Sequence, residues 1–554
     1  MTPAAPALDR FFEAYYRRRP VTATFTGVHA YDDRLPDWSP EGLADAVAEM
    51  RALRRELEAA GRVPDADVRR FPEDADPALA DAFLEIQIAE HEGPHFFRRN
   101  PALWTGEAIF SVLSLVTRDF APIDDRLRAA TARMHAIPGF LAEARRTLSD
   151  GPAAWRDKAL KECDAAAILF ERSLPAWATG DAAPGFTAGC DVAAEAFRQF
   201  RAWLAGELKV APDEAVSAGR DFLDLLLRRG HWSLPPTHAE VERALENEHA
   251  RLDAQLAAAG LPTWAAAQAR IAAERPTADD YLPRFTRTWQ RCHDAIRAAD
   301  VVTWPDHPVR YVPIPAHTRE AAPLLYYLFY RSPAAFDPPG VFDYVVPPID
   351  GLPPDEVERR LAAANDSAIL LNHVVHHGGL GHHVQNAHAR QSRSRAGQVA
   401  ATDAASRIAM FGGGTMAEGW ACYACDLAEE LGLLSPLDRL AQQHTRVRIA
   451  ARAVVDLALH GGDMTLDEAA RFYEARGLMP PAAARAEAVK ASMFPGTAVM
   501  YWLGTDEIHR LRATLASREG AAFSLKRFHD RLLAHGSIPV PLVARLMTAG
   551  VESS

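Results

Sequence analysis

Histidines gather in one short stretch of the sequence. Five of the 21 histidines lie within eleven positions, at His373, His376, His377, His382 and His383. Imidazole nitrogens are common ligands of zinc and other transition metals. A single histidine in an apolar segment is more simply a packed core residue, but this density is not expected from packing alone. The stretch therefore predicts a metal site.

Glycines separate the two histidine pairs, at Gly378-Gly379-Leu380-Gly381. On a straight helix, His376 and His383 would lie about 10 Å apart, which is too far for one ion. Because glycines bend or loosen a helix, we expect this stretch to bring the two pairs together. An alternative register pairs His373 with His377, four residues apart on one helical face.

A second candidate element follows the glycine-rich loop Gly412-Gly413-Gly414-Thr415. Glu418 lies near the start of the next helical pattern, where it is expected to reach back to the histidines as a carboxylate ligand. A mixed His and Glu shell is typical of catalytic zinc sites. The alternative role of Glu418 is to complement the helix dipole. Cys422 and Cys425 have CxxC spacing, but we interpret them as two buried thiols.

The order of these motifs resembles a bacterial family known as domain of unknown function 885, which is usually placed near the helical zinc metallopeptidases. The similarity runs nearly end to end, through residues 26–32, the histidine stretch, residues 418–423, residues 452–456 with His460, residues 495–498 with Tyr501, and residues 528–530. The resemblance implies a large helical metallopeptidase-like fold. It also implies metal ligation by His376, by His382 or His383, and by Glu418.

His377 departs from the pattern of that family. The pattern is His-Glu, two residues, Pro-Gly-His-His, one residue and Gln, and His377 stands in the place of its Glu. The resemblance implies that this Glu activates a water on the metal. Neutral histidine also accepts protons, so His377 is expected either to act as the base or to enter the coordination shell. Cys425 stands where relatives often carry an acidic residue.

Tyr501, His460 and Arg452 are further candidates for catalysis, by stabilising an oxyanion or binding a substrate carboxylate. The alternative for Arg452 is a helix pair with Asp456, four residues further on.

Together these residues predict a metal-dependent hydrolase of a peptide-like or amide bond, with one divalent transition metal, zinc in the first place. If His377 is a ligand, a site rich in imidazole suits iron, manganese or copper, and a non-hydrolytic or redox enzyme is the alternative. A third hypothesis is a non-catalytic metal-binding relative. The expected partner is a small-molecule or short peptide-like substrate, and the oligomeric state is left open.

Helices are the main elements expected to position these residues. Apolar side chains recur at helical spacing over residues 40–60 and 239–258, so the predicted class is mainly α. At 554 residues the chain exceeds the size of a single core. We expect an N-terminal helical lobe, residues 1–300, and a C-terminal metal-binding catalytic lobe, residues 301–554.

Two short runs, residues 309–314 and 341–346, have the β-branched and aromatic composition of strands. They are expected to pair as a small β-ribbon before the metal-binding helix. A free ribbon edge would suit an extended substrate, although a plain structural hairpin is the simpler interpretation.

Charge and hydropathy exclude two classes of partner. The formal net charge of −12 argues against nucleic acid, because binding to phosphates needs clustered Lys and Arg. No stretch is apolar enough to span a bilayer, and the first twenty residues do not have the pattern of a secretory signal. The five cysteines are scattered and odd in number, unlike a disulfide framework. We therefore expect a cytoplasmic protein that does not bind membranes.

Overall fold

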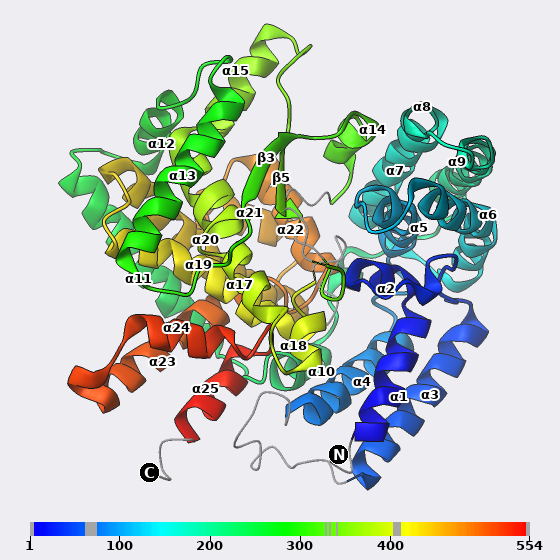
Figure 1. The fold of residues 1–554 in the computed structure, drawn as a ribbon, viewed down its shortest axis with the longest axis horizontal. Coiled ribbons are helices and arrows are strands. Elements are labelled where there is room, and N and C mark those ends of the chain that lie inside the picture. Colours follow the sequence, from blue (N-terminus) through cyan, green and yellow to red (C-terminus); the bar gives the residue numbers. More distant parts are fainter. Residues whose placement is uncertain are drawn as a thin grey trace.

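The computed structural model describes residues 5–60, 75–326, 330–331, 334–338, 342–402 and 411–549. The chain is mainly helical, as expected from its composition (Figure 1). Its first half contains α1 (Ala5–Arg18), α2 (Pro20–Thr26), α3 (Pro40–Ala59), α4 (Asp76–Glu92), α5 (Pro101–Val116), α6 (Ile123–Thr147), α7 (Ala153–Ile168), α8 (Leu174–Trp177), α9 (Ala183–Gly206), α10 (Arg220–Leu225), α11 (His238–Ala258), α12 (Trp264–Ala273) and α13 (Tyr281–Ala299).

The second half carries most of the predicted site residues. It contains α14 (Ala316–Arg319), α15 (Pro354–Ala363), α16 (Asp366–Ala368), the π-helix η7 (Ile369–Gly378), α17 (His382–Ala389), α18 (Arg395–Val399), α19 (Gly414–Glu430), α20 (Pro436–Gly461), α21 (Leu466–Ala475), α22 (Pro481–Met493), α23 (Met500–Glu519), α24 (Leu525–Leu533) and α25 (Val540–Ala549). Figure 1 places α17, α19 and α20 near the middle of the molecule, between α5–α9 on one side and α11–α13 on the other.

Capping residues explain where several helices begin. Thr237 forms a capping box with Glu240 at the start of α11, and Ser435 forms one with Asp438 at the start of α20. Each box satisfies backbone N–H groups that the first helical turn leaves unpaired. The helices expected over residues 40–60 and 239–258 are confirmed as α3 and α11.

The two strand-like runs do pair, as β3 (Val309–Pro313) and β5 (Phe342–Val346). They run parallel, so the interpretation as a plain hairpin is wrong. Parallel neighbours need a crossover connection, and here it contains α14 and the short strand β4 (Tyr330–Arg331). β4 adds antiparallel to β5, which gives the order β3-β5-β4. Val341 lies outside the described residues.

A further parallel pair joins β1 (Gly151–Pro152) to β2 (Val210–Ala211). Within the described ranges, no helix is long and apolar enough to cross a membrane.

Two hydrophobic clusters form the core. One contains Trp155 of α7 together with Val447 of α20, and the other contains Phe11 of α1 together with Trp420 of α19. Both clusters thus draw residues from either side of residue 300, so neither coincides with the expected division into lobes. The elements that carry the candidate site belong to both clusters, because α19 packs in the second and α20 packs mainly in the first.

Candidate metal centre

His376 and His377 lie in the last turn of the π-helix η7. The Nδ1 of His377 donates a hydrogen bond of 2.7 Å to the carbonyl of Asn372, five residues earlier, which is the spacing of a π-helix. This bond fixes the tautomer of His377 and leaves its Nε2 without a hydrogen. Burial and the neighbouring His376 and His382 hold the pKa of His377 well below its ordinary value. The ring is therefore neutral near pH 7, with Nε2 available to accept a proton or bind a metal.

The glycine-rich stretch forms the tight turn that the sequence predicted. The amide of Gly381 donates to the carbonyl of Val375 at 2.8 Å, which folds the start of α17 back onto the end of η7. A Cβ on Gly381 would lie 1.9 Å from the carbonyl oxygen of His376, and one on Gly378 would lie 2.3 Å from the hydroxyl of Tyr311. Only glycine fits this close approach.

Two buried indoles hold the turn from either side. Trp289 of α13 donates from Nε1 to the carbonyl of Gly378 at 2.7 Å, and Trp420 of α19 donates to the carbonyl of Leu380 at 2.8 Å. These bonds satisfy carbonyls at the end of η7 that the helix itself leaves free. The turn is thus fixed by helices distant in the sequence.

Replacing Gly381 by alanine is expected to displace His382 from the cluster. The backbone must move to accommodate a Cβ 1.9 Å from the oxygen of His376, and overpacking of this kind costs about 1–3 kcal/mol. We expect a lower melting temperature and weaker metal binding, measured by thermal unfolding and metal titration. The matched control is Gly206→Ala in α9, where a Cβ meets nothing within 4 Å. Equal behaviour of the two variants would contradict this role of the turn.

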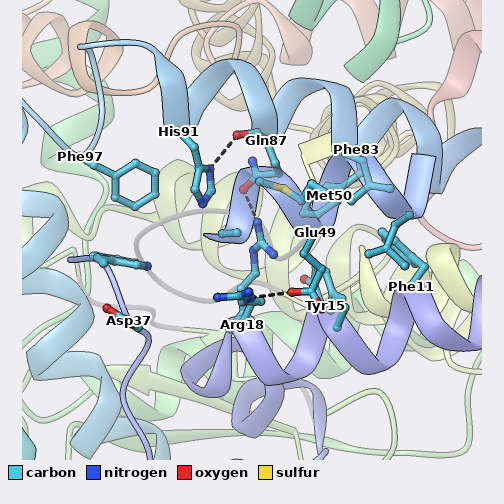
Figure 2. Close-up of a pocket in the computed structure, with 16 residues that line it drawn as sticks. Phe11, Tyr15, Arg18, Asp37, Glu49, Met50, Phe83, Gln87, His91 and Phe97 are labelled. Carbon is cyan, nitrogen blue, oxygen red and sulfur yellow. Dashed lines mark hydrogen bonds and ion pairs between the residues drawn. The ribbon is translucent and has the colours of Figure 1, made fainter. Parts of the chain in front are cut away.

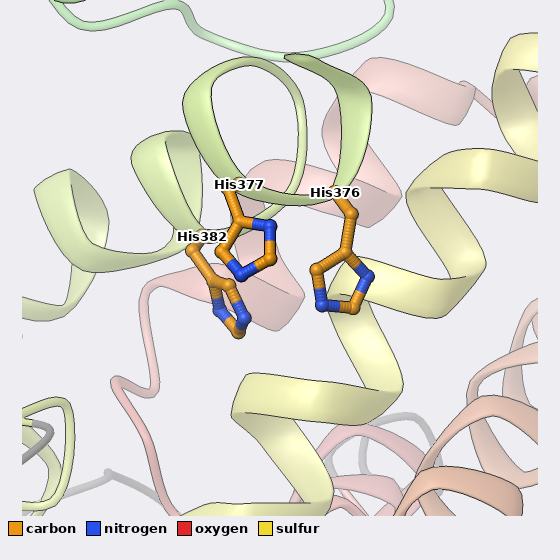
Figure 3. Close-up of side chains that lie close together, drawn as sticks. All are labelled: His376, His377 and His382. Carbon is orange, nitrogen blue, oxygen red and sulfur yellow. The ribbon is translucent and has the colours of Figure 1, made fainter. Parts of the chain in front are cut away.

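Three imidazoles converge across this turn. Figure 3 shows His376, His377 and His382 side by side, and one nitrogen from each lies within 4.8 Å of the others. The ring centroids of His376 and His382 are 4.9 Å apart, and those of His377 and His382 are 5.3 Å apart. Burial lowers the pKa of His382 to about 4, so this ring too is neutral near pH 7, the form that binds metals.

Glu418, in the second turn of α19, joins the three histidines. Its Oε2 lies 3.4 Å from Nε2 of His376 and 3.7 Å from Nε2 of His382. Burial raises the pKa of Glu418, but the adjacent His376 and His382 outweigh it and hold the pKa well below its ordinary value. The carboxylate is ionised, yet its Oε2 is buried without a hydrogen-bond partner.

A divalent metal ion fits this set of donor atoms. A buried carboxylate oxygen without a hydrogen bond is costly unless a cation compensates it. Two donors on a tetrahedral zinc lie about 3.3 Å apart, given bonds of about 2.0 Å, and the 3.4 Å and 3.7 Å separations at Glu418 are close to this value. The side chains of His376, His382 and Glu418 retain between 14% and 18% exposure, so the centre is reachable from solvent.

His383 and His373 point away from the cluster. His383 is fully buried, with its ring 4.6 Å from that of Phe342, and burial lowers its pKa to about 3. The sequence leaves His382 and His383 as alternative ligands. In the structure it is His382, and not His383, that lies beside Glu418. Nδ1 of His373 accepts a hydrogen bond of 2.5 Å from the hydroxyl of Tyr344 in β5, so the alternative register of His373 with His377 is not formed.

Tyr501 reaches the centre because α23 packs closely on α19. A Cβ on Gly419 would lie 2.5 Å from the Cα of Gly504, so the two helices touch backbone to backbone. Burial and the charge of Glu418 raise the pKa of Tyr501 well above its ordinary value. Its phenol therefore stays protonated, and in the part of the chain that the structure describes its hydroxyl has no hydrogen-bond partner.

Asp456 fixes the start of α23. Its buried carboxylate accepts hydrogen bonds from the backbone amides of Gly496, Ala498 and Val499, at 2.8 to 3.0 Å. These amides precede Tyr501, so Asp456 sets the position of that residue. The expected helix pair between Arg452 and Asp456 is accordingly wrong.

Arg452 instead lies between Tyr501 and an acidic residue of α22. Its guanidinium carbon is 4.8 Å from the centroid of the Tyr501 ring, and its Nε is 2.6 Å from a carboxylate oxygen of Glu487. The stacked cation orients the phenol. Arg452 therefore contacts both Tyr501 and Glu487.

His460 is a correction to the predicted catalytic set. Nδ1 of its fully buried ring accepts from the amide of Ala218 at 3.2 Å, and Nε2 donates to the carbonyl of Ala491 at 3.0 Å. Both nitrogens are occupied by backbone groups, which leaves none for a substrate. His460 is a structural link between α20, α22 and the segment before α10.

A model of a bacterial protein family of unknown function, DUF885, matches residues 20–547. The chain belongs to this family. No curated protein matches it.

Two solved structures share the fold of this DUF885 chain. One is described as "a putative lipoprotein of unknown function" from Shewanella oneidensis; it is 21% identical, with a TM-score of 0.75 over 98% of this chain and 99% of that one. The other is described as "the putative lipoprotein" from Colwellia psychrerythraea; it is 16% identical, with a TM-score of 0.69 over the whole of both chains. At these identities the likeness establishes the fold alone. The cytoplasmic location stays a prediction.

Two other features of the DUF885 chain are a pair of cysteines and a small pocket, and neither is part of the candidate metal centre. Cys422 and Cys425 are buried, and burial raises the pKa of both thiols, as expected for packed side chains. Figure 2 shows a pocket among α1, α3 and α4, lined in part by Phe11 and Met50. Its volume of about 50 Å³ is far below the roughly 300 Å³ of small-molecule sites.

Proposed function

We propose that this protein is a metal-dependent hydrolase of an amide or peptide-like bond. His376, His382 and Glu418 would hold one divalent transition metal, with zinc as the first candidate. The observation that carries the proposal is the buried Oε2 of Glu418, which lacks a hydrogen bond and faces the imidazoles of His376 and His382 at 3.4 Å and 3.7 Å. A carboxylate and imidazoles in this arrangement, partly open to solvent, are typical of a catalytic metal site.

The surrounding residues have separate roles in such a reaction. A bound metal would polarise the scissile carbonyl and lower the pKa of water. Nε2 of His377, which carries no hydrogen, would act as the proton acceptor. The protonated hydroxyl of Tyr501 would donate to the oxygen that becomes negative. Arg452 orients this phenol.

A second candidate function follows from the position of His377. One of its nitrogens lies within 4.8 Å of those of His376 and His382, so it can complete a site of three imidazoles and one carboxylate. The neutral form of His377 near pH 7 is also the form that binds a metal. Iron, manganese or copper would suit such a site, and the chemistry would be non-hydrolytic or redox.

Elemental analysis is expected to find about one transition-metal ion per chain in protein purified without added metal. In the same preparation, a panel of blocked dipeptides and acyl amino acids should be cleaved, and a chelator should stop the cleavage. Zinc with cleavage supports the hydrolase, whereas iron, manganese or copper without cleavage supports the second candidate. A metal content near zero after reconstitution would rule out both.

A further inference from the structure

A group of cationic side chains includes Arg452, which stacks on Tyr501. Arg448 and Arg452 are one turn apart on α20, and Arg452 pairs with Glu487 at 2.6 Å. Lys490, one turn after Glu487 on α22, acts with both arginines on the same carboxylate. Three cations therefore lie near one carboxylate, and only Arg452 is paired with it.

Arg448 is the member of this group that most clearly lacks a partner among the described residues. Its guanidinium forms no hydrogen bond or ion pair with any residue in the described ranges, and its Nε is buried. By contrast Arg446, two residues earlier on the same helix, is paired with Asp426 at 2.6 Å. A buried guanidinium nitrogen is normally hydrogen-bonded, so the unpartnered Nε of the half-buried Arg448 leaves this side chain able to bind an anion.

A hydroxyl in the same group also lacks a partner. Tyr473 of α21 is fully buried, and its hydroxyl forms no hydrogen bond within the described part of the chain. The charges of Arg448 and Arg452 both act on this phenol, which places all three side chains in one neighbourhood. A buried hydroxyl without a hydrogen bond is as unusual as a buried cation without an anion.

We propose that Arg448 and Arg452 bind a carboxylate group of the substrate beside the metal centre, with the Tyr473 hydroxyl as a further donor. Guanidinium groups bind carboxylates through paired, charge-assisted hydrogen bonds. The substrate class is therefore an amide that carries a free carboxylate, such as an acylated amino acid or a peptide with a free C-terminus. This assignment of substrate rests on the proposed hydrolase, whereas the anion site itself does not.

The position of Tyr501 connects the two sites. Its ring stacks on Arg452, and its helix α23 packs backbone to backbone against α19, which carries Glu418. A substrate held by its carboxylate at the arginines would extend past Tyr501 toward His376 and His382. Glu487 occupies one of the two arginines in the absence of substrate and so competes with the bound anion.

Hippurate tests the anion site, because it combines an amide with a carboxylate, and hippuramide is its uncharged counterpart. We expect calorimetry on the full chain, freed of metal, to show saturable hippurate binding and at least roughly tenfold weaker binding of hippuramide. Arg448→Gln should weaken hippurate binding by roughly 10- to 100-fold, the value of a charge-assisted hydrogen bond. Glu487→Gln should strengthen it, because the competing carboxylate is removed. The matched control is Arg439→Gln, an exposed arginine on the same helix.

Equal binding of hippurate and hippuramide by the unmodified protein would overturn the proposal, whether or not the variants fold. So would an Arg448→Gln variant that is folded and binds hippurate like the Arg439→Gln control. Metal uptake, measured on the same protein after reconstitution with zinc, separates this proposal from the proposed function. Hippurate selectivity in a protein that takes up no metal would support the anion site and contradict the hydrolase.

Discussion

Glu418→Ala is expected to lose most of its metal during purification and dialysis. Oε2 of Glu418 lies 3.4 Å from His376 and 3.7 Å from His382, and among the described residues it is the carboxylate in contact with the histidine cluster. Removal of a residue that only orients a ligand already costs about 10- to 100-fold in metal affinity, so loss of the ligand itself should cost more than about 100-fold. Plasma mass spectrometry of dialysed protein measures the change.

Cys425→Ser is the matched control for this prediction. Cys425 lies two turns further along α19 and is also buried, but its Sγ contacts the carbonyl of Leu371 at 3.5 Å and no metal-ligand candidate. We expect this variant to retain its metal. Equal losses from Glu418→Ala and Cys425→Ser would show that both act through the stability of α19, and Glu418 would then not be a ligand.

The histidine cluster of the candidate metal centre could be anticipated from sequence because its strongest signals are local. Histidine density marks the stretch, and the glycines mark the turn that the structure contains. The choice between His382 and His383 was not accessible, because neighbouring residues on a helix differ by about 100° in direction. The ring of Phe342, from a strand 41 residues before His383, contacts the one of the two that is buried in the core.

Long-range contacts explain the remaining errors. The composition of β3 and β5 indicated strands but carried no information on their direction, which depends on the crossover between them. His460 has the residue type of a catalyst, yet amide and carbonyl groups of Ala218 and Ala491 occupy both its nitrogens. Arg452 has an acidic residue at helical spacing, but that carboxylate binds three backbone amides instead.

Arg448 and Glu487 were missed at the sequence level for a related reason. Arg448 precedes Arg452 by one turn, and this spacing was the one available signal that both lie on the same face of α20. Three arginines within seven residues of a helix usually lie on a face exposed to solvent, so their spacing alone is weak evidence for a binding site. The informative observation is that Arg446 has an acidic partner and Arg448 does not, and this requires the structure.

His377→Gln is expected to keep its metal and to lose about 10²- to 10⁴-fold in turnover, the usual contribution of a general base. His377 lies further from His382 than His376 does, with ring centroids 5.3 Å rather than 4.9 Å apart, and no contact joins it to Glu418 within 4 Å among the described residues. The remaining donors, His376, His382 and Glu418, still form a complete set of three protein ligands. Metal content and cleavage of the best panel substrate are measured on the same preparation.

His377→Glu sharpens the same test, because glutamate stands at this position in the family pattern that the sequence resembles. Under the hydrolase proposal, the carboxylate takes over as proton acceptor, so this variant should retain metal and recover activity relative to His377→Gln. If His377 is instead the fourth ligand, metal content and activity should fall together in His377→Gln, and the metal of His377→Glu should differ from that of the unmodified protein. Parallel loss of metal and activity would therefore replace the hydrolase by the second candidate, with three imidazoles and Glu418 around an iron, manganese or copper ion.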